Sequence, residues 1–230
     1  MVRIEGLSEP DLRRAMKDRR LPFLEELLKT QDYRLLSHYS GLPSSTPAMQ
    51  GELFYGVHCA VPSLRYYDTG KHTPVSMLDL ETASTVEDEI ASERTPLLAG
   101  GSSYANVFHG GADRSRFCLS TTGRGAAIRG KRLSLIARLP AIYACIPGRF
   151  LVETLVQLGS ALAGAVREPG RPGRPVSRLG ALFSRAGVCI LLRELTKARM
   201  LIDLAQGVPI VHGSLLGYDE QAHYRGPSSA

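Results

Sequence analysis

The sequence has no tryptophan, only four cysteines in 230 residues, and no apolar stretch at its amino terminus. The cysteines lie far apart without a C-x-x-C pair, which argues against a zinc ribbon or a redox motif and predicts reduced, partly buried thiols. The first residues lack the apolar core of a secretory signal. We therefore expect a cytoplasmic protein, and a chain of this length can bury a hydrophobic core without disulfides.

Charge is unevenly distributed along the chain. Residues 114–200 contain 16 Lys and Arg but only 3 Asp and Glu, a balance of +13, whereas the remainder contains 12 against 19, a balance of −7. The split predicts two modules with different partners. Specific nucleic-acid binding is not expected, because the arginines are not interleaved with aromatic residues.

The acidic part predicts alternating helices and strands. A short apolar strand ends at Glu5, and Ser8 then begins a helical pattern that breaks near Pro22 into two helices. Thr46 and Pro47 predict the N-cap and first residue of another helix. The remaining expectations are a strand over 33–39, an acidic helix over 79–93, a glycine- and serine-rich loop over 97–111, and a buried parallel strand over 208–216. The fold class expected is α/β, with a mostly parallel central sheet flanked by helices.

The basic middle, 124–207, predicts a helical insertion between 1–123 and 208–230. Apolar helical runs over 133–146 and 150–166 precede a Pro- and Gly-rich linker over 167–178 and a second helical region over 179–204. Helices packed on the core with solvated arginines are one interpretation; the alternatives are a cap over an active site, a surface for anionic lipid and a membrane span. A span is disfavoured, because the 17 residues of 150–166 include Glu153 and Gln157.

Several side chains can carry chemistry. Asp219 and His223 lie four residues apart, so one helical turn places a carboxylate and an imidazole together as ligands of a divalent ion. The alternative is that Asp219 caps a turn and His223 is solvated. The Thr46 hydroxyl at a helix amino terminus either caps that helix or attacks phosphorus there. We expect His109 and His212 to be loop and strand histidines that bind no metal.

The segment 43–56, PSSTPAMQGELFYG, resembles the nucleophile segment of the alkaline phosphatase superfamily, in its type I phosphodiesterase/nucleotide pyrophosphatase branch. The matched positions are Pro43, Thr46, Leu53 and Gly56. The opening VRIEGLS is similar to the family's first strand, with Glu5 in place of a metal-binding Asp. GYDEQAHYRGP resembles the family's D-x-x-x-H metal segment, matched by Asp219, His223 and Gly226. The three segments occur in the family's order.

The resemblance implies a phosphoesterase with Thr46 as nucleophile and two divalent ions, usually zinc. It implies that Glu5 and Thr46 bind one ion and that Asp219 and His223 bind the other. Backbone N–H groups at Gly101 and Ser102 and the amide of Asn106 are expected to bind substrate oxygens; the alternative is an ordinary glycine turn.

The resemblance covers only the first part of the family's catalytic domain, which continues with a further Asp-His pair and another His, so we expect a truncated domain. The expected substrate is a small phosphoric ester, linked to a lipid or a nucleotide. The competing hypothesis is a non-catalytic member of the family that binds a partner or an anionic membrane surface, with the chain peripheral at that membrane.

Overall fold

The computed structural model describes residues 1–58, 60–92, 94–122 and 187–225, and five single residues between 148 and 159. The linker over 167–178, the apolar run over 133–146, most of the run over 150–166 and Gly226 lie outside the described residues. The fold of the expected insertion is therefore known only from its last part.

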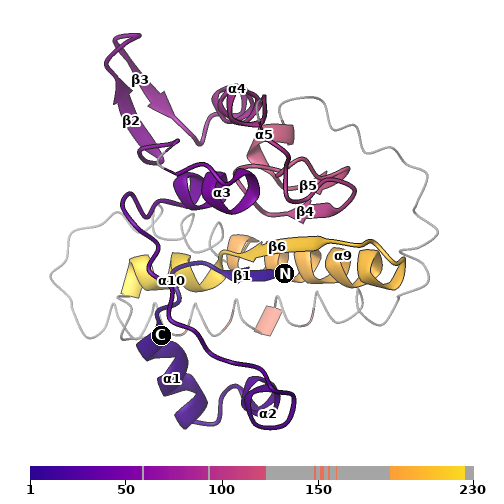
Figure 1. Cartoon of the computed structure of the whole chain (residues 1–230). Helices are drawn as coiled ribbons and strands as arrows, with labels where there is room; N and C mark the ends of the chain where they lie inside the picture. Colours follow the sequence, from indigo (N-terminus) through magenta and orange to yellow (C-terminus); the bar gives the residue numbers. More distant parts are fainter. Residues whose placement is uncertain are drawn as a thin grey trace, which may run out of the picture.

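The centre of the described structure is a parallel sheet of four short strands in the order β1-β6-β4-β5 (Figure 1). Their bounds are Val2–Ile4, Val211–Leu215, Ser102–Tyr104 and Arg114–Arg116 respectively. Each neighbouring pair is parallel, and Gly213 aligns with both Val2 and Tyr104. The predicted α/β class with a parallel sheet and flanking helices is confirmed, and so is the strand predicted over 208–216.

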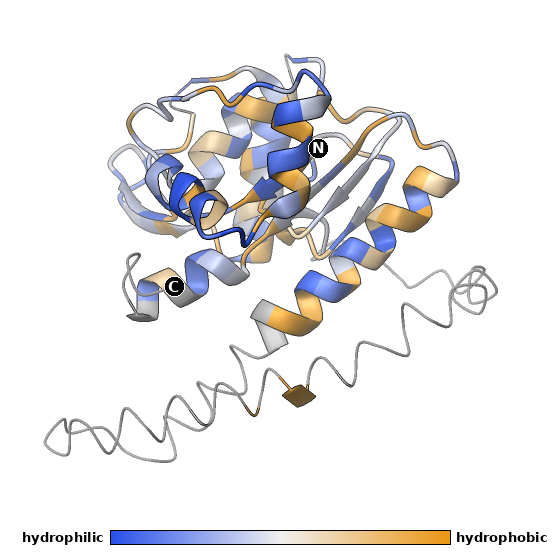
Figure 2. Cartoon of the chain, turned by 90° about the horizontal axis from the view of Figure 1, so that it is seen from below, coloured by the Kyte–Doolittle hydropathy of each residue, from blue (hydrophilic) through white to orange (hydrophobic). Residues whose placement is uncertain are grey.

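Helices cover both faces of the sheet. α9 (Arg193–Ala205) packs against β6 and β4, so closely that a Cβ on Gly213 would lie 2.4 Å from the sulfur of Met200. Figure 2 shows hydrophobic and hydrophilic residues alternating along this helix. The other face meets α3 (Thr46–Tyr55), where the ring of Phe54 contacts His212 edge-on at 5.0 Å between centroids.

The main hydrophobic core lies on the α3 side of the sheet. It joins α3, α4 (Leu80–Ala91), α5 (Leu119–Thr122) and the loop after β4, and its largest buried side chains include Phe54, Met77, Leu98 and Phe108. The acidic helix predicted over 79–93 is observed as α4, and Asp79 is its N-cap, accepting a hydrogen bond from the amide of Thr82.

The amino-terminal helices form as the sequence predicts. α1 (Glu9–Lys17) begins after Ser8, whose hydroxyl accepts from the amide of Asp11, and α2 begins at Pro22 and ends at Thr30. The strand expected over 33–39 is wrong, because that segment has no regular structure and is mostly exposed. Its apolar residues therefore do not form the buried face that a strand needs.

The remaining elements are a hairpin and the carboxyl-terminal helices. β2 (Arg65–Asp68) and β3 (Thr73–Ser76) pair antiparallel and project from the body, at the top of Figure 1. A π-helical segment, η1 (Gly187–Leu192), leads into α9, and α10 (Gly217–Arg225) follows β6. Among the described residues, no helix has both the length and the apolar character needed to cross a membrane.

Candidate functional site

The first two predicted site residues meet at the carboxyl edge of the sheet. Glu5 directly follows β1, and Thr46 is the first residue of α3. The Thr46 hydroxyl donates a hydrogen bond to Oε2 of Glu5 at 2.8 Å, across 41 positions in the sequence. In a parallel sheet this edge is where ligands bind, because the loops after the strands converge there.

Thr46 is not the N-cap predicted from the sequence. Ser45 has the extended backbone of an N-cap, Thr46 is already helical, and Pro47 follows in the first turn. The Ser45 side chain makes no capping hydrogen bond, and its oxygen is buried without a hydrogen-bond partner. The Thr46 hydroxyl is consequently directed to Glu5 instead of its own helix, and the first amides of α3 have no side-chain cap.

Glu5 is only 5% exposed, and its second carboxylate oxygen has no hydrogen-bond donor. That oxygen forms an ion pair with Arg3, whose Nε lies 3.5 Å away. Nη1 of the same guanidinium is also buried without a hydrogen-bond partner. Glu5, which is hydrogen-bonded to Thr46, and its ion-pair partner Arg3 therefore both have unused hydrogen-bonding capacity.

Asp219 approaches the same place from the last described helix. A Cβ built on Gly6 would lie 2.5 Å from Oδ1 of Asp219, so the Asp219 carboxylate lies against the backbone next to Glu5. Gly6 has a φ of +71°, a conformation that an L side chain rarely adopts. Glycine at position 6 thus permits both the turn after β1 and the approach of Asp219.

The Asp219–His223 pair lies on one helical turn of α10, the spacing on which the prediction of a shared ion depends. Nε2 of His223 is 3.5 Å from Oδ2 of Asp219, and the side chains are 79% and 38% exposed. A carboxylate and an imidazole at this spacing fit one divalent ion with water completing its shell. Glu5 fits a second ion poorly, because its oxygens already face a hydroxyl and a guanidinium. The described part of the chain contains no group of three His, Cys, Asp or Glu side chains arranged for a metal.

The three residues expected to bind substrate are not brought to Thr46. Gly101 and Ser102 lie at the amino end of β4, level with Val211, whereas Glu5 and Thr46 lie beyond the carboxyl ends of the strands. Ser102 is fully buried, so it offers no surface to a ligand. The glycine- and serine-rich segment was expected to be a loop; residues 102–104 instead form a central strand.

The third of these residues, Asn106, is part of a buried hydrogen-bond network. Oε1 of Gln50 accepts the amides of Val107 and Phe108, at 2.9 and 3.0 Å, so its Nε2 must donate to Oδ1 of Asn106. The Asn106 amide nitrogen then donates to Nδ1 of His212 at 3.0 Å, which leaves the imidazole proton on Nε2. The network joins α3 to the sheet and thereby positions Thr46.

His212 is fully buried in this network, and Nε2 has no hydrogen-bond partner. Burial, the largest cause, acts together with the positive charges of the amino terminus and Arg3 to lower the pKa of His212 from 6.5 to about 4. The imidazole is therefore neutral at pH 7. Gln50, which the sequence analysis missed, had one signal: it lies four residues before buried Phe54 on the same helical face.

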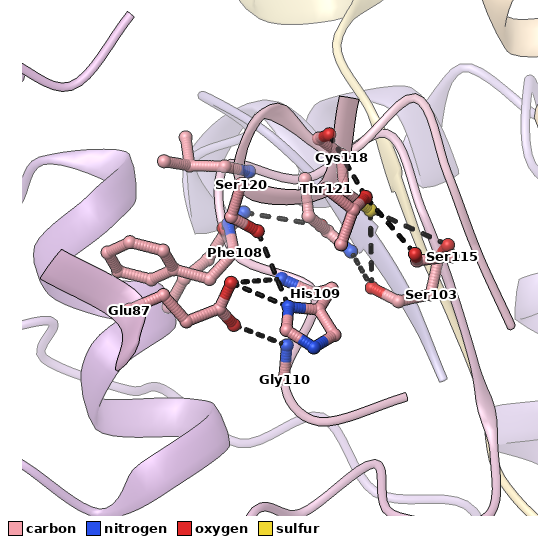
Figure 3. Close-up of polar contacts among 12 residues, drawn as sticks. Glu87, Ser103, Phe108, His109, Gly110, Ser115, Cys118, Ser120 and Thr121 are labelled. Carbon is pink, nitrogen blue, oxygen red and sulfur yellow. Dashed lines mark hydrogen bonds and ion pairs between the residues drawn. The ribbon is translucent and has the colours of Figure 1, made fainter. Parts of the chain in front are cut away.

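A second buried polar cluster joins α4 to the loop after β4 (Figure 3). Oε2 of Glu87 lies 2.7 Å from Nδ1 of His109, and the Ser120 hydroxyl lies 3.4 Å from the same nitrogen. A Ser-His-Glu triad needs the serine and the carboxylate on opposite ring nitrogens. Glu87 and Ser120 both contact Nδ1 of His109, so the imidazole cannot pass a proton from the serine while the carboxylate orients it. We therefore interpret the cluster as structural.

Cys118 is a structural thiol. It is fully buried, and burial raises its pKa to about 11, so the reactive thiolate is negligible at neutral pH. Its sulfur contacts Ser103 and the carbonyl of Arg116, each at 3.6 Å. The sequence prediction of a reduced, buried thiol holds for Cys118, which forms no disulfide.

No family model, no curated protein and no solved structure matches this chain. The case for a function therefore depends on the geometry at Glu5, Thr46 and Asp219 and on the motifs that predicted it.

Proposed function

We propose that the chain is a phosphoric ester hydrolase in which Thr46 is the nucleophile. One observation carries the proposal: the Thr46 hydroxyl is hydrogen-bonded at 2.8 Å to a buried carboxylate from a strand 41 residues away. A helix residue that served only to begin α3 would need no such partner. The resemblance to the type I phosphodiesterase branch of the alkaline phosphatase superfamily names these same two positions, and it remains a resemblance.

The proposed reaction uses the chain's own groups at each step. The Thr46 oxygen forms a bond to phosphorus as the ester P–O bond breaks, and Glu5 accepts the hydroxyl proton that it already binds. Uncapped amides in the first turn of α3 stabilise the negative charge on the phosphoryl oxygens. Glu5 gives that proton to the departing alcohol oxygen. Water then attacks phosphorus and loses a proton to Glu5, the bond between Thr46 and phosphorus breaks, and the Thr46 oxygen recovers the proton from Glu5 as the phosphate product leaves.

The proposal includes a metal ion, with Asp219 and His223 as its ligands. These side chains would hold one divalent ion, zinc by their donor types, and bound there it would polarise the ester and stabilise the leaving oxygen. Small phosphoric esters, including those of lipids and nucleotides, are the proposed substrate class.

The test of the proposed function is hydrolysis of nitrophenyl phosphate and bis(nitrophenyl) phosphate with added zinc. Thr46→Ala should abolish release of nitrophenol, while the control Thr85→Ala should retain it. Thr85 is a suitable control because it is exposed and its hydroxyl bonds only within α4, to the carbonyl of Glu81. A Thr46→Ala protein with full activity would remove the nucleophile assignment.

The exposure of the Asp219–His223 pair favours a second candidate function, a non-catalytic binding protein that does not hold zinc in stoichiometric amount. His223 is 79% exposed, and only one carboxylate accompanies it. This candidate predicts less than one zinc per chain in equilibrium dialysis and binding to vesicles of anionic lipid. One tightly bound zinc together with hydrolysis of the nitrophenyl esters would exclude it.

A further inference from the structure

The nucleophile's carboxylate already has a cation from its own strand. Arg3 and Glu5 are two residues apart at β1, so their side chains extend from the same face. Nε of Arg3 lies 3.5 Å from Oε1 of Glu5, while Oε2 of Glu5 accepts the Thr46 hydroxyl. Glu5 thus contacts both the guanidinium of Arg3, through an ion pair, and the proposed nucleophile Thr46, through a hydrogen bond.

The guanidinium has capacity that its described contacts do not use. Nη1 is buried without a hydrogen-bond partner, although a guanidinium carries five N–H donors and an unmade bond at a buried donor is costly. Two further buried atoms at this place lack hydrogen-bond partners: Oε1 of Glu5 and the hydroxyl of Ser45, the residue before Thr46. The positive charge of Arg3 also contributes to the lowered pKa of His212.

The unsatisfied donors among these groups, Nη1 of Arg3 and the hydroxyl of Ser45, suit a tetrahedral oxyanion. A guanidinium matches two phosphoryl oxygens at once, and a serine hydroxyl and the first amides of a helix supply further donors. Glu5 alone would repel an anion, but the adjacent guanidinium compensates its charge. We propose that Arg3 binds the phosphoryl group of the substrate and supplies, beside Glu5, the positive charge otherwise expected of a second divalent ion. This inference rests on the proposed function and assigns its substrate-binding residue.

The first test measures binding of inorganic phosphate by calorimetry, using full-length protein freed of metal with a chelator. The wild type should bind phosphate, and Arg3→Gln should bind it at least about tenfold more weakly, because a charged hydrogen-bond donor is lost. Arg34→Gln, at an exposed arginine, is the matched control and should bind like the wild type. Equal affinities for the wild type and Arg3→Gln, or no phosphate binding by the metal-free wild type, would overturn the proposal.

The second test counts zinc by equilibrium dialysis. The wild type should hold no ion at Glu5, whereas removing the guanidinium in Arg3→Gln frees the carboxylate, so that this variant binds one more zinc per chain than the wild type. A wild type with two tightly bound zinc ions contradicts the inference, since Glu5 would then be a metal ligand despite Arg3.

Folding of each variant is checked by circular dichroism. If Arg3→Gln does not fold, Arg3→Lys is tested in its place. Lysine keeps the positive charge but cannot donate two parallel hydrogen bonds, so we expect Arg3→Lys to bind phosphate about fivefold more weakly than the wild type. Unchanged affinity in Arg3→Lys would then overturn the inference.

The inference and the proposed function fail separately. If Thr46→Ala abolishes hydrolysis while Arg3→Gln binds phosphate normally, only the role of Arg3 is lost. If phosphate binding depends on Arg3 but Thr46→Ala keeps its activity, the anion site stands and the nucleophile assignment is lost.

Discussion

The surroundings of Glu5 and Glu87 differ sharply, although both carboxylates are almost fully buried, at 5% and 1% exposure. Glu87 accepts hydrogen bonds from the Tyr55 hydroxyl at 2.6 Å and the Gly110 amide at 2.8 Å, and it also contacts the amide and ring of His109. Glu5 has one hydrogen-bond donor, Thr46, and an oxygen with none.

The difference separates a structural charge, Glu87, from one that fits the proposed function, Glu5. Burial acts to raise the pKa of Glu87, but the hydrogen bonds from His109 and its other donors outweigh burial, so the pKa is lowered. A buried charge satisfied in this way holds α4 to the loop after β4. A buried carboxylate that is short of donors has capacity left for a ligand or a proton, which is what the proposed chemistry at Thr46 requires.

The largest effect is expected from breaking the satisfied cluster. Glu87→Ala leaves buried donors of Tyr55, His109 and Gly110 unpaired, which should lower the free energy of unfolding by about 4 kcal/mol. Urea denaturation measures the loss. Glu89→Ala, at an exposed position of the same helix, serves as control. A loss below about 1 kcal/mol for Glu87→Ala would show that the cluster is not structural.

Lowering the pH should destabilise the folded protein through protonation of His212. The pKa of His212 is lowered to about 4 in the folded state from 6.5, so below pH 6.5 the unfolded chain binds a proton that the folded chain does not. Stability should therefore fall between pH 6.5 and 4 by about 3 kcal/mol and then level off in this contribution.

The measurement for His212 is urea unfolding at a series of pH values, compared with His212→Gln, which lacks the titrating group. The variant should lack the extra loss between pH 6.5 and 4. Glu87 acts in a lower window: its folded pKa is depressed, so its contribution is present above about pH 4.5 and is lost as pH falls through the folded pKa. An equal pH dependence in the wild type and His212→Gln would contradict the assignment.

Glu5→Gln should separate function from folding. The amide keeps the shape of the side chain but cannot accept the Thr46 proton, so hydrolysis of nitrophenyl phosphate should fall at least about 100-fold. Stability should change by less than about 1 kcal/mol, because Glu5 has few hydrogen bonds to lose. Glu26→Gln, at an exposed glutamate in α2, should keep full activity. A Glu5→Gln protein that is strongly destabilised would place Glu5 in the same structural class as Glu87.

The smallest expected effect comes from Tyr55→Phe, which measures how much of the stabilising free energy of the Glu87 cluster one hydrogen bond contributes. Tyr55→Phe removes one hydrogen bond of 2.6 Å to the carboxylate and should cost about 1.5 kcal/mol in urea unfolding. The remaining donors keep Glu87 partly satisfied, so the loss should stay well below that of Glu87→Ala. Equal losses in the two variants would mean that the tyrosine alone satisfies the carboxylate.

Sequence reasoning found the elements whose signals are local. Ser8, Pro22 and Asp79 mark helix starts, and the apolar run before Leu216 marks the central strand. It missed β4 because 102–104 reads Ser-Ser-Tyr, polar residues buried by tertiary contacts. Burial by neighbours cannot be read from a three-residue segment.

The candidate site was only partly predicted, again because contacts between distant segments cannot be inferred from a short stretch of sequence. The motifs named Glu5, Thr46 and Asp219, but spacing cannot show that Arg3 occupies the position beside Glu5 or that Asn106 is held inside by Gln50. Both depend on which face of a strand or helix meets which partner. The register of β1 on β6 fixes the first, and the packing of α3 on the sheet fixes the second.

That register also sets an order for assembly during synthesis. β1 pairs with β6, which inserts between β1 and β4, so Val2 finds its neighbour Gly213 only after more than 200 further residues have been made. Contacts over such sequence separation form slowly, because a long loop must close first. Thr46 and its helix can fold early, but the strand that places Glu5 beside it joins the sheet only once β6 is present.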